Sequence, residues 1–426
     1  MESYAGESDY LKELQVRAVL PDGFRCATTS IEFFPKERRV AQALPMNLAL
    51  ILLDEASPRF GGVFTRNRFP GAPVLIGRRR LTEDAIRGVL INNKISNVCT
   101  QRGEENAEAL LTALGRHLDA RPRSFFAAST GIIGWELPRE EMENALPRLV
   151  ARLDATSILP VARAIMTTDA FPKVRRAFVG SGSIVGIAKG AGMIDPNMAT
   201  LLCFLCTDLD VPRDVLREEL AWCVERSLNR ISVDSDQSTS DMAIMLSSGR
   251  RGEVSRDELR AGLLAVLSGL ALDIMRNAEG VGHVVRVQVT GATSEGAAVS
   301  VARAVVNSPL VKTAIFGNDP NVGRIVSAIG DHMGNTAETF EPQRMTLRMG
   351  GIDIFAGGRF LLDPGKEEVL SAYLKDRALD PRRTPWPQHD RTVDIEIGLG
   401  ASLVRAEVLG SDLSYEYVRE NADYRS

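Results

Sequence analysis

Short apolar runs alternate with amphipathic stretches from one end of this chain to the other, and this alternation constrains the fold most. Residues 88–91 and 124–128 are apolar runs bounded by polar residues, as in buried strands. Between them, residues 104–118 carry apolar side chains at the i, i+3, i+4 and i+7 spacing of one helix face, and residues 211–230 repeat that spacing. A third helix is predicted over 255–275, where Ser255 and Glu258 have the spacing of a capping box. Because no regular βαβ period appears, we expect a layered α/β fold and neither a Rossmann fold nor a barrel.

The C-terminal part adds predicted strands at 283–289, 345–347 and 393–397, a helix from Asp412, and an exposed loop over the proline-rich, charged residues 376–391. The apolar run 201–206 predicts another buried strand. It contains the C-x-x-C pair Cys203 and Cys206, for which a redox or metal role is the alternative. No second C-x-x-C completes a zinc site, so we interpret both cysteines as small apolar core residues.

With 426 residues, the chain is long enough for two or three domains. Hydrophobic residues make up 44% and charged residues 25%, and the formal net charge is -4, so no broad surface for nucleic acid or an anionic membrane is indicated. The apolar runs 48–53 and 201–206 are far shorter than the roughly 20 residues of a membrane span, and the N-terminus is acidic and polar. We expect a soluble, cytoplasmic protein that binds neither nucleic acid nor a membrane.

Histidine spacing and the short motifs disfavour several hydrolase classes. The four histidines never stand three or four residues apart; they are His117, His283, His332 and His389. Neither H-E-x-x-H nor G-x-S-x-G occurs, which disfavours a zinc hydrolase and an α/β-hydrolase. Gly180, Gly182 and Gly186 miss the G-x-G-x-x-G spacing by one residue, and Lys189 precedes a glycine where a P-loop has the reverse order. By itself, this stretch predicts a tight turn before the strand that begins at Thr200.

The same stretch carries a longer motif, because residues 189–200 read Lys-Gly-Ala-Gly-Met-Ile-Asp-Pro-Asn-Met-Ala-Thr. This motif resembles the self-cleavage motif of the ornithine acetyltransferase (glutamate N-acetyltransferase) family. Further motifs similar to that family follow in order along nearly the whole chain; they are residues 62–67, 72–74, 129–134, 164–169, 238–241, 279–280, 308–314, 319–325 and 421–426. Collinear motifs over this length make the resemblance specific.

The resemblance implies a proenzyme that cuts itself between Ala199 and Thr200 into an α chain, residues 1–199, and a β chain, residues 200–426. The Thr200 hydroxyl attacks the carbonyl of the preceding residue, and water opens the resulting ester. The new N-terminal α-amine, whose ordinary pKa is about 7.7–8.0, then serves as general base for the Thr200 nucleophile, a pair that needs no histidine. The implied fold is an αββα-type sandwich similar to that of ornithine acetyltransferases and aminopeptidases.

The family also implies the remaining site residues. The hydroxyl of Thr130 and the N–H of Gly131 match its donors to the oxyanion. Residues that match its substrate contacts are Thr168 (with Thr167 as the alternative), Lys189, Thr200, Glu279, Asn421 and Ser426. Lys189 would bind a carboxylate and Glu279 an ammonium group. The family uses neither metal nor cofactor, so we interpret Asp234, Asp236 and Asp241 as structural. Its substrates are small amino acids, and its paired α and β chains assemble further, into a heterotetramer (α2β2) or a larger oligomer.

Four departures from the family pattern bear on the identity of donor and acceptor. Residues 92–97 read Asn-Asn-Lys-Ile-Ser-Asn where the family usually has Asn-Ser-Gly-Asn-Ala-Asn, Val322 replaces a tryptophan, His283 a lysine and Ser426 a threonine. We predict a self-processing N-acetyltransferase of arginine biosynthesis that moves an acetyl group from N-acetylornithine to glutamate through an acyl-Thr200 intermediate. The alternatives are an N-terminal-nucleophile amidohydrolase or aminopeptidase, a specialised-metabolism acyltransferase for another amino acid, and a non-catalytic binding subunit.

Overall fold

The computed structural model describes residues 4–195, 201–336, 341–380, 384–400 and 402–423, and it divides into two compact units. The larger unit comprises Ser8–Asn229 and Gln237–Ile274. The smaller unit comprises Met1–Glu7, Arg230–Asp236 and Met275–Ser426. Each unit has its own sheets and its own apolar core.

Helices and strands alternate through both units. The α-helices are α1 (Glu7–Arg17), α2 (Ala72–Arg80), α3 (Gly103–Leu118), α4 (Arg139–Ala151), α5 (Leu159–Ala164), α6 (Arg213–Glu225), α7 (Arg256–Arg276), α8 (Glu295–Val306), α9 (Pro309–Phe316), α10 (Val322–Gly334), α11 (Pro364–Asp376) and α12 (Tyr415–Ala422). The strands are β1 (Phe24–Phe33), β2 (Leu44–Ser57), β3 (Phe60–Phe64), β4 (Ile86–Asn92), β5 (Phe125–Ser129), β6 (Lys173–Val179), β7 (Gly182–Lys189), β8 (Leu202–Asp210), β9 (Ile231–Ser232), β10 (Met242–Glu253), β11 (Val284–Thr290), β12 (Thr346–Met349), β13 (Ile352–Ala356), β14 (Arg359–Phe360), β15 (Val393–Gly398) and β16 (Arg405–Ser411). Short 3-10 helices are η1 (Pro122–Ser124) and η2 (Leu228–Arg230).

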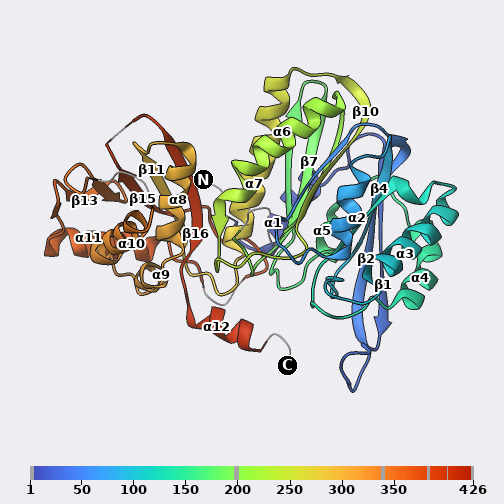
Figure 1. The fold of residues 1–426 in the computed structure, drawn as a ribbon, viewed down its shortest axis with the longest axis horizontal. Helices are drawn as coiled ribbons and strands as arrows, with labels where there is room; N and C mark the ends of the chain where they lie inside the picture. The colour runs from blue at the N-terminus through green and yellow to red at the C-terminus, as the bar shows by residue number, and fades with distance from the viewer. Residues whose placement is uncertain (1–3, 196–200, 337–340, 381–383, 401, 424–426) are drawn as a thin grey trace. The chain divides into compact units, whose positions relative to one another are not determined.

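The larger unit has four layers, with two sheets between two layers of helices (Figure 1). A four-stranded sheet of order β1-β2-β4-β5 faces a five-stranded sheet of order β3-β10-β8-β7-β6. Aromatic rings join the two sheets: the centroid of Phe60 on β3 lies 6.0 Å from that of Phe126 on β5, edge to face. Helices α3 and α4 cover the four-stranded sheet, and α6 and α7 cover the five-stranded one (Figure 1). The predicted αββα sandwich is therefore confirmed.

The strand register of the five-stranded sheet brings the termini of three strands to the same end of the sheet. Strand β8 pairs with β7 in antiparallel fashion, with Lys189 opposite Leu202. It pairs with β10 in parallel fashion, with Met242 opposite the same Leu202. The C-terminal end of β7 and the N-terminal starts of β8 and β10 therefore meet at the same end of the sheet, and β7 ends at Lys189, the first residue of the predicted cleavage motif.

The smaller unit is built on one seven-stranded sheet of order β14-β13-β12-β15-β11-β16-β9. Its core joins the sheet to α8, α10 and α11 through side chains such as Val301, Ile325 and Leu370, all fully buried. Among the residues that the structure describes, no single helix is long and apolar enough to cross a membrane. The pair α8 and α9 passes by length and composition only when taken together, and it is bent by 57°.

Most of the predicted elements are confirmed. The predicted strands at 88–91, 124–128, 201–206, 283–289, 345–347 and 393–397 correspond to β4, β5, β8, β11, β12 and β15, and the helices predicted over 104–118 and 255–275 to α3 and α7. The capping box at α7 is present, since the backbone N–H of Ser255 donates to Oε2 of Glu258 at 2.9 Å and the N–H of Glu258 donates to Oγ of Ser255 at 3.3 Å.

Two predicted helix boundaries and one predicted exposure are wrong. The helix predicted over 211–230 ends at Glu225, because the Arg226 N–H bonds the Cys223 carbonyl three residues back and the Ser227 hydroxyl occupies the same carbonyl. The last helix starts at Tyr415 and not at Asp412, since Ser414 caps it. The predicted exposed loop 376–391 is partly buried: Leu379 and His389 are enclosed, and burial lowers the pKa of His389.

Candidate active site

The predicted oxyanion turn directly follows β5. The backbone N–H of Thr130 donates to the carbonyl of Asn92 at 3.1 Å, and the N–H of Ile132 donates to the carbonyl of Lys94 at 2.9 Å, so the turn lies against the segment after β4. Gly131 between them has φ = +127°, a conformation that suits glycine. Its N–H has no hydrogen-bond partner among the described residues and so remains available to a ligand.

Lys189 lies beside this turn. Its Nζ is 3.2 Å from Oγ1 of Thr130, and both side chains are buried. An ammonium group only donates hydrogen bonds, so the Thr130 oxygen must be the acceptor in this contact. The hydroxyl hydrogen of Thr130 is then free to point elsewhere. The structure thus brings together three of the predicted site residues, Thr130, Gly131 and Lys189.

A buried ion pair supports the neighbourhood of Lys189. Asp169 accepts from Nζ of Lys173 at 2.5 Å and from the N–H of Gly190 at 2.8 Å, and both charged side chains are fully enclosed. Burial by itself would raise the pKa of Asp169. The positive charges of Lys173 and Lys189 outweigh burial, so the pKa of this carboxyl group lies below its ordinary range. The pair fixes the backbone immediately after Lys189.

Neither Asp169 nor Lys173 was assigned a role from the sequence. Asp169 ends the motif 164–169, and Lys173 is the first residue of the strand β6, which also carries Arg175 and Arg176. A charged residue that is buried without a solvent path normally has a partner of opposite sign nearby. Thr168, predicted to line the pocket, is half-buried in the same loop, next to Asp169.

Asp241 is the second buried carboxylate near this end of the five-stranded sheet. It stands just before β10 and is 1% exposed, and its Oδ2 has no hydrogen-bond partner among the described residues. Burial raises the pKa of Asp241 well above its ordinary value, and nearby Lys189, the Leu201 N–H and the Ser238 hydroxyl oppose this rise without cancelling it. Asp241 was interpreted as structural from the sequence, and its contacts with Leu201 and Ser238 leave one of its two carboxylate oxygens, Oδ2, without a partner among the described residues.

Glu279 and Asn421 meet in the smaller unit. Nδ2 of Asn421, on α12, donates to Oε2 of Glu279 at 2.9 Å. Glu279 is buried, whereas Asn421 is exposed. The resemblance named both as substrate contacts, and the structure joins them although they are 142 positions apart. Ala199, Thr200 and Ser426, which the sequence analysis also named, lie outside the described residues.

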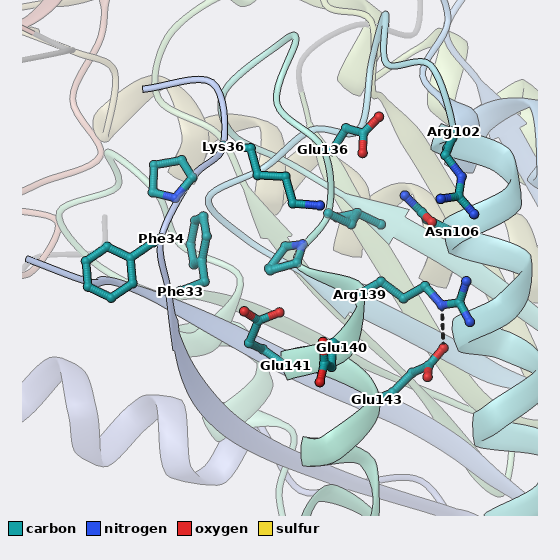
Figure 2. A pocket seen from close by; sticks show the side chains of 13 residues that line it. Phe33, Phe34, Lys36, Arg102, Asn106, Glu136, Arg139, Glu140, Glu141 and Glu143 are labelled. Carbon is teal, nitrogen blue, oxygen red and sulfur yellow. Dashed lines mark hydrogen bonds and ion pairs between the residues drawn. The ribbon is translucent and has the colours of Figure 1, made fainter. Parts of the chain in front are cut away.

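A cavity of about 430 Å³ lies elsewhere in the larger unit, between the end of β1, the loop before α4 and part of α3. Charges of both signs line it, including Lys36 and Arg139, and Nε of Arg139 lies 2.7 Å from Oε1 of Glu143 (Figure 2). None of the predicted site residues that the structure describes lines this cavity. We therefore do not assign the acyl-transfer chemistry to it.

The C-x-x-C pair has the setting predicted for it. Cys203 and Cys206 lie in β8, are at most 1% exposed and form no disulfide. Burial raises the pKa of the Cys203 thiol to about 12, and it raises that of Cys206 as well. Both are inert core residues at neutral pH.

Comparisons with known proteins define the class of the chain, an acyltransferase of arginine biosynthesis. The family model described as "ArgJ family" matches residues 38–426. The chain is 39% identical to "Arginine biosynthesis bifunctional protein ArgJ" of Nitratidesulfovibrio vulgaris, over 95% of this chain and 99% of the relative. It is 36% identical to "Glutamate N-acetyltransferase Oat2" of Streptomyces clavuligerus, over 92% and 98%. The chain belongs to the ArgJ family.

Among solved structures, the chain is similar to the arginine biosynthesis bifunctional protein ArgJ from Bacillus halodurans. The sequence identity is 31% and the TM-score 0.45, over 52% of this chain and 98% of that chain.

Proposed function

We propose that this protein is a self-processing N-acetyltransferase of arginine biosynthesis, which transfers an acetyl group from N-acetylornithine to glutamate through an ester on Thr200. The observation that carries the proposal is the contact of Lys189 with Thr130 beside Gly131. It leaves one O–H and one N–H unengaged at adjacent positions, as a hole for a tetrahedral oxyanion requires. The name of the relative "Glutamate N-acetyltransferase Oat2" supports glutamate as the acceptor, and N-acetylornithine is the donor that the family resemblance implies.

Self-processing comes first. The Thr200 hydroxyl attacks the Ala199 carbonyl carbon, the peptide C–N bond breaks, and its nitrogen takes the hydroxyl proton. One water then hydrolyses the ester, which leaves a carboxylate on Ala199 and a free α-amine on Thr200. The cut lies between the antiparallel neighbours β7 and β8, so the two products remain paired within one sheet. The α chain (1–199) and β chain (200–426) therefore stay assembled.

Transfer uses the same atoms in two half-reactions. The α-amine takes the proton of the Thr200 hydroxyl while its oxygen attacks the acetyl carbonyl of the donor. Thr130 and Gly131 donate to the oxyanion, and collapse releases ornithine, whose nitrogen takes the proton. The amine of glutamate then attacks the ester carbonyl carbon, the ester C–O bond breaks, the Thr200 oxygen takes up the amine's proton, and N-acetylglutamate leaves. Lys189 binds a substrate carboxylate, Thr168 and Ser426 line the pocket, and Glu279 with Asn421 binds the ammonium end of the donor.

The proposal extends to the setting of the enzyme. We propose that it acts in the cytoplasm and that two αβ pairs assemble into a heterotetramer. Size-exclusion chromatography with light scattering of the purified protein measures this assembly. A mass of a single 46.4 kDa αβ pair would contradict the heterotetramer.

Denaturing gels and intact mass measurements test the chemistry. The wild-type protein is expected to run as two polypeptides, and Thr200→Ala as one inactive chain. Incubation with N-acetylornithine alone should leave the β chain about 42 Da heavier, the mass of an acetyl group, because the ester waits for an amine. Thr200→Ser is the matched control, since it keeps a hydroxyl and should still be cut. A wild-type protein that stays full length and still transfers acetyl groups would contradict the mechanism, and donor consumption that is independent of glutamate would indicate a hydrolase.

A further inference from the structure

Two lysines and one carboxylate are buried together at the end of β7. Strand β6 pairs with β7 in antiparallel fashion, and Lys173 at its start stands opposite Ala188, the neighbour of Lys189. The side chains of Asp169 and Lys173 are fully enclosed, and Lys189 is 6% exposed. The positive charges of both lysines act on Asp169. The register of β6 and β7 therefore brings two cations to a single buried carboxylate.

The carboxylate of Asp169 takes Lys173 as its partner. Its Oδ1 accepts from Nζ of Lys173 at 2.5 Å and from the N–H of Gly190 at 2.8 Å. Its Oδ2 accepts from the N–H of Thr167 at 3.1 Å. The two N–H groups are neutral, so the counter-charge in these contacts comes from Lys173.

Lys189 directs its ammonium group elsewhere. Its Nζ lies 3.2 Å from Oγ1 of Thr130, and within the described part of the chain it forms no ion pair. A lysine ammonium is carried on a flexible four-carbon stem, and the interior of a protein screens charges poorly. If Lys173 were absent, Asp169 would be a buried carboxylate without a counter-ion, which is costly. Lys189, next to Gly190, is the cation placed to relieve that cost.

Charge balance gives this arrangement a function. With their ordinary charges, Asp169, Lys173 and Lys189 carry one net positive charge, which suits a substrate carboxylate. We propose, resting on the substrate role of Lys189 in the function above, that Lys173 is a positioning residue. By holding the carboxylate of Asp169, it keeps the ammonium group of Lys189 beside Thr130, where that group binds the carboxylate of the acyl donor.

Two further carboxyl groups lie near these lysines. Asp273 acts on Lys173, but its two oxygens accept from Nε and Nη2 of Arg175 at 2.6 Å and 2.7 Å. Asp241 and Lys189 also act on each other, and burial raises the pKa of Asp241 well above its ordinary value, which favours the neutral form. Both groups are unchanged in the variants below, so differences among those variants come from Asp169 and the lysines.

The preference for a donor carboxylate tests the proposal. The ratio of kcat/KM is measured between N-acetylornithine and its amide, in which the α-carboxylate is replaced by a neutral group. Lys173→Met should lower this ratio roughly 10-fold or more, because Lys189 turns to Asp169 and a charge-assisted hydrogen bond to the donor is lost. The matched control is Asp169→Asn, which breaks the same ion pair but leaves no carboxylate to attract Lys189. It should keep the wild-type ratio.

The double variant Asp169→Asn/Lys173→Met removes both charges of the pair and should recover the wild-type ratio. A merely structural role predicts instead that both single variants lose the preference and that the double variant does not recover it. Equal losses in the two single variants, or a double variant that keeps a low ratio, would overturn the inference. A wild-type protein that transfers no acetyl group, or that uses both donors equally, would instead overturn the proposed function.

Thermal unfolding provides a second test that requires no activity. If Lys189 replaces Lys173 at Asp169, then Lys189→Met should lower the Tm more in the Lys173→Met protein than in the wild type, because it removes the last counter-ion of a buried carboxylate. This extra loss should disappear when Asp169→Asn is added. Additive Tm losses, or a Lys173→Met chain that does not fold, would refute the exchange of cations.

Discussion

Gly131 and Gly134 offer a matched pair of substitutions within the turn after β5. Both have positive φ, +127° and +86°. A Cβ at Gly131 would lie 2.2 Å from the carbonyl carbon and 2.3 Å from the carbonyl oxygen of Lys94, whereas a Cβ at Gly134 would meet nothing within 4 Å. Gly134→Ala therefore adds positive-φ backbone strain alone, and Gly131→Ala adds positive-φ strain together with a collision against main chain.

The two magnitudes follow from this geometry. For Gly134→Ala, the unfavourable φ should cost about 1–2 kcal/mol of stability and lower the Tm by about 2–8 °C, with kcat unchanged. For Gly131→Ala, ordinary contact begins near 3.4 Å, so the turn or the Lys94 backbone must shift by about 1.2 Å. A displacement of about 1 Å at a catalytic group can cost roughly 100-fold in rate, and we expect a kcat loss of that order in addition to the loss of stability.

Three measurements on both variants separate strain from misplacement. Thermal unfolding reports the strain, a denaturing gel reports self-cleavage, and steady-state transfer from N-acetylornithine to glutamate reports kcat and KM. The loss should fall on kcat and spare KM, because the turn binds the transition state more than the substrate. Equal kcat losses in Gly131→Ala and Gly134→Ala, or a Gly131→Ala enzyme with wild-type kcat, would refute the assignment of the turn as the oxyanion hole.

Thr130→Ala removes one oxyanion donor and should lower kcat roughly 100-fold with little change in KM, measured on protein whose processing is checked by gel; a rise in KM alone would make Thr130 an ordinary substrate contact. Lys94→Gly should raise stability by about 0.5–1 kcal/mol in thermal unfolding, because Lys94 holds φ = +76°, and a lower Tm would contradict this. Glu279→Gln should raise KM for N-acetylornithine more than for a donor with an uncharged side chain, and equal effects on both donors would speak against an ammonium contact. Burial lowers the pKa of Lys312 to about 8, below the ordinary 10.5, so the unfolded state binds more protons between these values. The Tm of the wild type relative to Lys312→Met should therefore rise from pH 8 to 10.5, and a constant difference would count against the buried charge.

Periodicities within short stretches of sequence were sufficient to predict most of the helices and strands. The helix α3 and the strands β4 and β5 were predictable because helical and strand periodicities are properties of neighbouring residues. Where the prediction failed, a local detail decided the boundary: the Ser227 side chain ends α6 by bonding the Cys223 carbonyl, which apolar spacing does not reveal. The oxyanion candidates Thr130 and Gly131 could be named because they are adjacent in a contiguous motif.

The sequence by itself therefore determined the layered α/β class, the individual helices and strands, and the residue types at the candidate site. Only the tertiary structure decided which of these residues meet. Lys189 hydrogen-bonds Thr130, 59 positions away, because the two sheets face each other. Asp241 lies opposite Leu201, 40 positions away, because β10 pairs with β8 in one register. A shift of one residue in that register would turn Asp241 to the other face of the sheet. Register and sheet packing depend on the summed burial of many distant side chains, so no local stretch of sequence contains them.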